Sequence, residues 1–103
     1  MNTMKTMMAV AALALATGNV KAETVNNMVV GPYDKGDCGT VMDMYQTRDF
    51  TALAHFVADG KGLLIEAGTK VSVLHVDIFG GTEQVRPAGE SRGVWVPIEF
   101  VNR

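Results

Sequence analysis

The sequence predicts a small, mainly β domain that is preceded by two short helices, so the fold class is α+β overall. Three observations support this prediction. Apolar residues recur at helical spacing between about residues 39 and 60, the spacing changes to strand-like alternation from Gly62, and glycine-rich turns then separate five short apolar runs. Of the 103 residues, 48% are hydrophobic and 19% are charged, as in an ordinary globular protein. The length allows one domain.

Residues 1–22 are predicted to be a secretory signal peptide. Lys5 provides a positive start, an almost wholly apolar segment runs from Thr6 to Thr17, and Val20-Lys21-Ala22 places small residues where signal peptidase cleaves. This apolar segment has 12 residues, whereas a helix needs about 20 to span a bilayer. We therefore expect export to the periplasm or the medium after cleavage near Ala22, with no membrane span in the mature chain. A buried N-terminal helix of the domain is the alternative interpretation.

Charge and cysteine content exclude several classes of protein. Cleavage would leave Glu23 to Arg103, 81 residues with seven basic and eleven acidic side chains and a net charge of −4. Such a chain lacks the basic surface that binds phosphate backbones, so we expect no nucleic-acid partner. The single cysteine, Cys38, allows neither an internal disulfide nor a cysteine-based zinc site. It lies 16 residues beyond Ala22, too far for a lipid anchor.

The two helices are predicted within residues 37–60, after an N-terminal arm or loop over residues 23–36 that has room for one short strand. The first helix runs from about Gly39 to Gln46, with one apolar face formed by Val41, Met44 and Tyr45. The second begins after Asp49, which caps its N-terminus, and ends at Gly60 in the left-handed conformation. Its single apolar stripe consists of Phe50, Leu53, Ala54 and Val57.

Residues 61–103 are predicted to form a small closed or sandwiched β-structure. Its hairpin turn is Phe79-Gly80-Gly81, because paired glycines supply positive φ without steric cost. The hairpin residues Glu83, Glu90 and Arg92 are interpreted as solvated side chains that keep strand edges soluble. The five expected strands cover residues 63–65, 70–78, 82–86, 94–96 and a last short strand reached through a tight turn over residues 98–101.

Residues 62–101 resemble a bacterial SH3-like (SH3b-type) barrel. The resemblance is carried by Gly68-Thr69-x-Val71-x-Val73, Val85-Arg86 and Trp95-Val96-Pro97-x-x-Phe100-Val101. The last pattern is similar to the strand, one-turn helix and strand that end SH3 folds. The resemblance implies a five-stranded SH3-like barrel with Val96 and Val101 inside, and Trp95, Pro97 and Phe100 towards a ligand. The acidic-aromatic cluster with which eukaryotic SH3 domains grip proline-rich ligands is missing from the sequence, so polyproline recognition is not expected.

The function that the resemblance implies is that of an exported, non-catalytic binding module without a cofactor. Its ligand would be a protein or peptide of the cell envelope, or peptidoglycan. The candidate ligand-binding groove consists of Trp95, Pro97 and Phe100, with Tyr33 and Tyr45 contributed by the N-terminal segment. The alternative is a structural or assembly protein, acting as a dimer whose groove is covered by its own helices. The oligomeric state is left open by the sequence.

Cys38, His55 and His75 raise the possibility of a cysteine hydrolase or, together with Asp37 or Asp77, of a metal site. Neither histidine has a flanking catalytic motif, and no pair of ligands has the spacing of one helical face. The neighbouring acids Asp34, Asp37 and Asp43 should raise the thiol pKa and so oppose a nucleophilic role. We therefore expect no catalytic residue and no metal site.

The acidic sequence Asp34-Lys35-Gly36-Asp37 is the remaining candidate for cation binding. It lacks the sixth-position glycine and the later bidentate glutamate of a calcium loop. We interpret it as a solvated turn.

Overall fold

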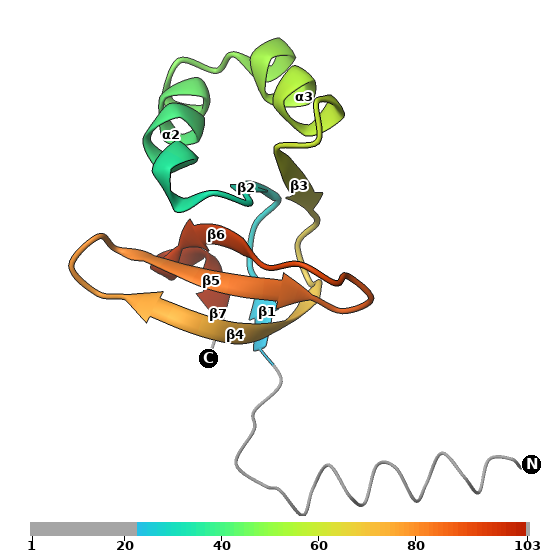
Figure 1. Cartoon of the computed structure of the whole chain (residues 1–103), viewed down its shortest axis with the longest axis vertical. Helices are drawn as coiled ribbons and strands as arrows, with labels where there is room; N and C mark the ends of the chain where they lie inside the picture. The colour runs from blue at the N-terminus through green and yellow to red at the C-terminus, as the bar shows by residue number, and fades with distance from the viewer. Residues whose placement is uncertain (1–22, 103) are drawn as a thin grey trace, which may run out of the picture.

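The computed structural model describes residues 23–102, which form an α+β fold of antiparallel strands and two helices (Figure 1). The predicted signal peptide lies outside the described residues. Within them, no helix has the length and apolar character needed to cross a membrane. In chain order the elements are β1 (Glu23–Val25), β2 (Val29–Pro32), the one-turn helix η1 (Lys35–Asp37), α2 (Cys38–Gln46), α3 (Phe50–Ala58), β3 (Gly62–Ile65), β4 (Lys70–Asp77), β5 (Thr82–Pro87), β6 (Val94–Pro97), η2 (Ile98–Phe100) and β7 (Val101–Asn102).

The main sheet has five antiparallel strands in the order β6-β5-β4-β1-β7. The first strand of the described chain lies inside this sheet, where Glu23 faces Val71 of β4 and Val25 faces Val101 of β7. The strand pairings leave β6 and β7 as edges, so they do not close a barrel. Residues 23–36 therefore supply two strands, rather than an arm with room for one.

The helices and the strand at residues 63–65 are placed differently from the prediction. Both helices lie between β2 and β3 in the sequence. They therefore separate β1 from β4, the first two strands of the main sheet, and do not precede the β-structure. The strand predicted at residues 63–65 is β3, which pairs with β2 in a separate two-stranded sheet. Its place among the five sheet strands is taken by β1. A three-residue strand is too short to show the alternation by which strands are predicted.

The two helices form where local signals predicted them. The Asp49 side chain accepts a hydrogen bond from the backbone N–H of Ala52 at 3.1 Å, and Gly60 adopts φ 78° directly after the helix cap. The apolar side chains of α3 are spread over a broader part of the helix surface than the predicted stripe, however, and only some of them are buried. Leu53 and Phe56 are the buried residues of α3, whereas Phe50 and Ala54, two members of the predicted apolar stripe, are exposed.

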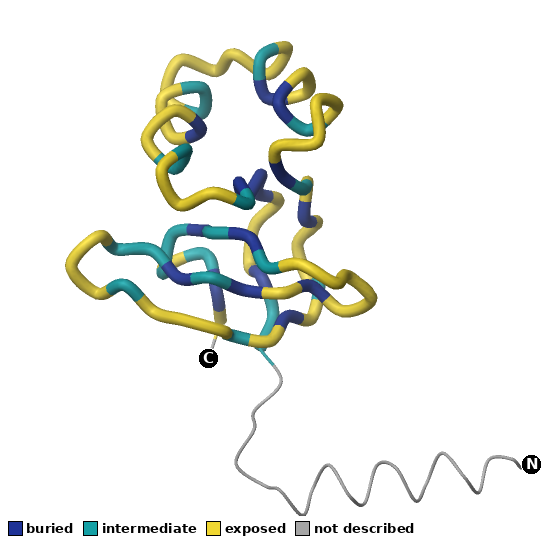
Figure 2. The backbone as a smooth tube through the Cα atoms, viewed as in Figure 1, coloured by how far each residue is buried: buried dark blue, intermediate teal, exposed yellow. Residues whose placement is uncertain are grey.

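The buried residues form two clusters, one under the sheet and one under the helices (Figure 2). Strand β2 connects them, because successive side chains of a strand point to opposite faces. Val29 joins the sheet cluster and Val30 the helical one. The sheet cluster also contains Val25, Ile65, Val71, Val85, Val94, Val96 and Val101, and the helical cluster Val41, Leu53 and Phe56. The inward positions predicted for Val96 and Val101 are thus confirmed.

Glu83 corrects the interpretation of the hairpin residues as solvated. Its side chain is fully buried, while Glu90 and Arg92 are exposed as expected. The reason is strand alternation, since Glu83 shares one face of β5 with the buried residues Val85 and Pro87. Glu83 therefore belongs to the interior of the sheet.

Candidate binding groove

Trp95 lies half-buried on β6 and is contacted by side chains of the same molecule. The pairing of β4, β5 and β6 places His75 opposite Gln84, and Gln84 opposite Trp95. The His75 ring meets the indole edge-on, with the centroids 5.8 Å apart, and the Lys35 ammonium lies 5.3 Å from the indole centroid. These contacts place a cation and an imidazole on the ring that was predicted to receive a ligand.

Trp95, Pro97 and Tyr45, three of the five predicted groove residues, line one crevice between β6 and α2. Its volume is about 30 Å³, which holds a water molecule rather than a ligand side chain. Helix α2 forms its other wall with Cys38, Val41 and Met42. The insertion between β1 and β4, which comprises β2, α2, α3 and β3, therefore covers this part of the main sheet.

Tyr33 and Phe100 do not line that crevice. Arg92 stacks on the Tyr33 ring, with its guanidinium carbon 3.7 Å from the ring centroid. Phe100 packs against the buried cluster of the sheet. The five residues are thus not gathered into one groove, and ligand binding by them stays a prediction.

A larger groove, of about 420 Å³, lies between α3 and the β2–β3 pair. Helix α3 contributes one long wall, formed by Phe50, Leu53, Ala54, Val57 and Ala58. Met28, Val30, Tyr45 and Leu64 complete the lining. Three of these side chains are large and mostly exposed: Met28 at 60%, Phe50 at 61% and Leu64 at 51%. The molecule thus presents an open, continuous apolar surface at this place.

The groove contains one side-chain hydroxyl, that of Tyr45, and its oxygen already accepts a hydrogen bond from the same molecule. The donor is the backbone N–H of Val30, at 2.7 Å. Burial raises the pKa of Tyr45, an effect that the hydrogen bond from Val30 partly offsets. The hydroxyl is therefore neutral at physiological pH, and the groove offers a ligand an uncharged apolar surface.

Cys38 lies half-buried at the start of α2. Its thiol pKa is raised, mainly by burial. Lys35 opposes this effect, whereas Asp37, Asp34 and Asp77 reinforce it. Of the three acids predicted to raise this pKa, Asp34 and Asp37 contribute less than burial does, and Asp43 is not among the causes. A thiol with a raised pKa is a poor nucleophile at neutral pH.

The two histidines are separated by the fold. His55 is exposed on α3, and His75 packs on Trp95 from β4. Across residues 23–102, no group of three or more histidine, cysteine or acidic side chains is arranged to hold a metal ion.

A groove beside α3 is not among the predictions from the sequence, which give this helix a single apolar stripe. The sequence of this helix, FTALAHFVA, carries polar side chains only at Thr51 and His55. A helix that is apolar around most of its circumference needs a second apolar partner besides the core. That signal was present in the sequence, but the position of the second face depended on where β2 and β3 pair.

Comparisons with protein-family models, with curated proteins and with solved structures found no match to this chain.

Proposed function

We propose that this protein is an exported, non-catalytic binding module that takes an apolar segment of an envelope protein or peptide into the groove between α3 and β2–β3. The observation that carries the proposal is the groove itself, with a volume of about 420 Å³ and an almost wholly apolar lining. Clefts that bind ligands typically measure about 300–1,000 Å³ and are lined mainly by apolar side chains. Burial of apolar area would supply the binding free energy.

The chemistry of the groove favours a peptide over peptidoglycan. A glycan presents many hydroxyl groups, and burying them costs free energy unless each finds a partner. The groove offers a single side-chain hydroxyl, on Tyr45, whose oxygen already accepts a hydrogen bond from Val30, so one O–H donor would have to serve many glycan hydroxyl groups. Apolar side chains projecting from a peptide need no such partners, as in the helix-in-groove and pocket modes of peptide recognition.

We also propose that the five-stranded sheet is a partly open SH3-like barrel. Strand β6, the one-turn helix η2 and β7 follow one another as in the ending that the resemblance implied. The first and last strands of the described chain are neighbours, with Thr24 opposite Asn102. The long insertion with β2, α2, α3 and β3 would then separate the first two barrel strands and bring its own binding surface.

The second candidate, a structural or assembly protein, is favoured by one observation. Helix α2 covers the crevice beside Trp95 and Pro97, as expected for a protein whose groove is closed by its own helices. In that case the open groove beside α3 would be the surface for assembly.

The test is peptide selection from a random library with two matched variants of α3. Ala54→Glu places a charge inside the groove, whereas Thr51→Glu places the same side chain on an exposed position outside it. We expect the wild type and Thr51→Glu to select peptides with aromatic or aliphatic anchors. Ala54→Glu should bind the same peptides at least about tenfold more weakly, which corresponds to about 1.4 kcal/mol. Circular dichroism checks that both variants are folded.

A result that would overturn this placement is binding to isolated peptidoglycan sacculi that Ala54→Glu retains and Trp95→Ala loses. The ligand surface would then be the one around Trp95.

A further inference from the structure

The turn between β4 and β5 carries the most exposed large apolar side chains of the described chain. Ile78 is 76% exposed, and Phe79 is completely exposed at its tip. Exposure of such a side chain forgoes the free energy that its burial would contribute. Two adjacent residues of this kind on a protruding turn form an apolar knob, and an apolar knob is typical of an interaction site.

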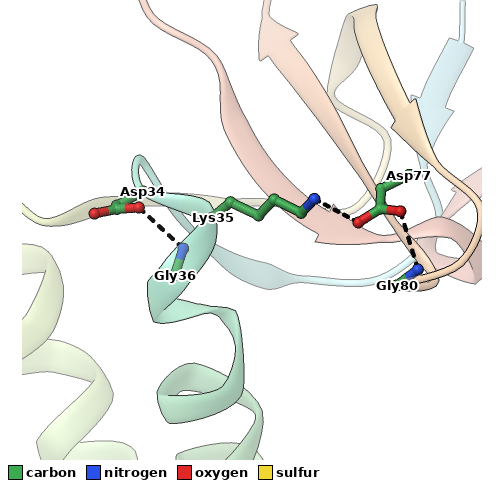
Figure 3. Close-up of polar contacts among 5 residues, drawn as sticks. All are labelled: Asp34, Lys35, Gly36, Asp77 and Gly80. Carbon is green, nitrogen blue, oxygen red and sulfur yellow. Dashed lines mark hydrogen bonds and ion pairs between the residues drawn. The ribbon is translucent and has the colours of Figure 1, made fainter.

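The knob is held in a fixed conformation by polar contacts at its base (Figure 3). The Asp77 carboxylate accepts a hydrogen bond of 3.0 Å from the backbone N–H of Gly80. The other Asp77 oxygen lies 2.5 Å from the Lys35 ammonium, which ties the turn to η1. Gly81 adopts φ 71°, and its N–H donates to the carbonyl of Ile78 at 3.2 Å. A preorganised turn loses little conformational entropy when it docks.

We infer that the knob of one molecule, Ile78 and Phe79, inserts into the α3 groove of a second copy. This inference rests on the proposed function, because it names the occupant of the same groove. Both halves of the contact are on the same chain, namely two large apolar side chains on a slender turn and an apolar groove that can take them. Gly80 and Gly81 follow the knob, so no side chain of theirs blocks its entry.

The positions of the knob and the groove determine the kind of assembly. Figure 1 shows the β4–β5 turn at the far end of the sheet from α3, on the opposite side of the molecule. A molecule therefore cannot fill its own groove with its own knob. The contact between two copies is heterologous, and it joins molecules head to tail into rings or open chains.

Charge disfavours an anionic lipid surface as the binding partner of the knob; a second copy is also acidic, so the contact between copies rests on burial of apolar area and not on charge. The chain from Glu23 to Arg103 carries a net charge of −4, and Asp77 lies directly beside the knob. Anionic lipid would repel both. The groove adds no charge to oppose association, since its lining is apolar apart from the neutral Tyr45 hydroxyl.

The test measures mass against concentration by analytical ultracentrifugation of the exported protein and four variants. Phe79→Ser removes the knob, and Ala54→Glu blocks the groove. Leu74→Ser and Thr51→Glu are matched controls, because both positions are exposed and lie outside knob and groove. We expect the wild type and both controls to associate as concentration rises, and the other two variants to remain monomers.

Mixing the two defective variants is the decisive step. One of them retains an intact groove and the other an intact knob, so the mixture should form a one-to-one dimer that cannot grow further. Failure of the mixture to form this dimer overturns the inference. Association of the wild type that neither variant weakens also overturns it.

Two further outcomes separate this inference from the proposed function. A wild type that stays monomeric but selects apolar peptides that Ala54→Glu loses would refute the self-contact alone. A monomeric wild type that binds vesicles of phosphatidylglycerol and phosphatidylcholine, and loses this binding in Phe79→Ser, would assign the knob to lipid and overturn the inference.

Discussion

At Gly31, strand β2 packs directly against β6 of the main sheet. A Cβ at this position would lie 2.7 Å from Val94 Cγ2 and 3.0 Å from the backbone oxygen of Trp95. We expect Gly31→Ala to lower the free energy of unfolding by about 1–3 kcal/mol, because overpacking must displace backbone there. Urea denaturation measures the change.

Gly39 provides the matched control for this prediction. It lies in α2, and a Cβ added there meets nothing within 4 Å. Gly39→Ala should leave stability unchanged or raise it by up to about 1 kcal/mol, since alanine is the better helix former. Equal effects of the two substitutions would contradict the close approach of β2 to β6.

Single residues also show where prediction from the sequence succeeded and failed. Val96 and Val101 were correctly expected inside, because the alternation of a strand fixes which side chains share a face. The same alternation places Glu83 on the face of β5 that carries Val85, although the charge of Glu83 predicts exposure. The surroundings of Trp95 were not predictable, because Lys35 and His75 reach it from distant parts of the chain.

At the scale of elements, the Lys35–Asp77 ion pair ties the insertion that carries the helices to the hairpin of the main sheet. The hydrogen-bonded ammonium of Lys35 holds the pKa of Asp77 below its ordinary value of 3.8, and the N–H of Gly80 adds to this effect. A group with a lowered folded-state pKa stabilises the fold above its unfolded pKa, and this contribution is lost as the pH falls through the folded pKa.

We therefore expect the unfolding free energy of the wild type to fall more steeply between pH 5 and pH 2 than that of Asp77→Asn. Urea denaturation across this range measures both slopes. Glu90→Gln is a suitable control, because Glu90 is exposed on another turn. Parallel slopes for the wild type and Asp77→Asn would show that the ion pair does not couple η1 to β4 in solution.

The elements differ in how far their own sequences specify them. Helices α2 and α3 were predicted within a residue or two, because caps and apolar spacing are local signals. Strand β1 was not predicted, since its stability comes from β4 and β7, and Thr24 faces a residue near the other end of the chain. The α3 groove is non-local in the same sense. It depends on the pairing of β2 with β3, which no short stretch of sequence encodes.

At the scale of the whole molecule, cleavage after Ala22 remains a prediction from the sequence, and the fold limits how far beyond Ala22 cleavage can move. Strand β1 (Glu23–Val25) pairs with both β4 and β7. Cleavage after Ala22 keeps this strand intact, whereas cleavage beyond Val25 would remove a core side chain that is 1% exposed. We therefore expect intact-mass spectrometry of the exported protein to give the mass of residues 23–103.

Two substitutions near the expected cleavage site test this prediction directly. Signal peptidase reads small residues at the first and third positions before the cut, here Ala22 and Val20. Ala22→Arg should therefore leave an uncleaved precursor in the membrane fraction, whereas Lys21→Gln, at the position between them, should be processed normally. Full-length wild-type protein in the cytosol would refute export, and with it the envelope partner. The contact between knob and groove would remain, because it depends only on residues of the folded domain.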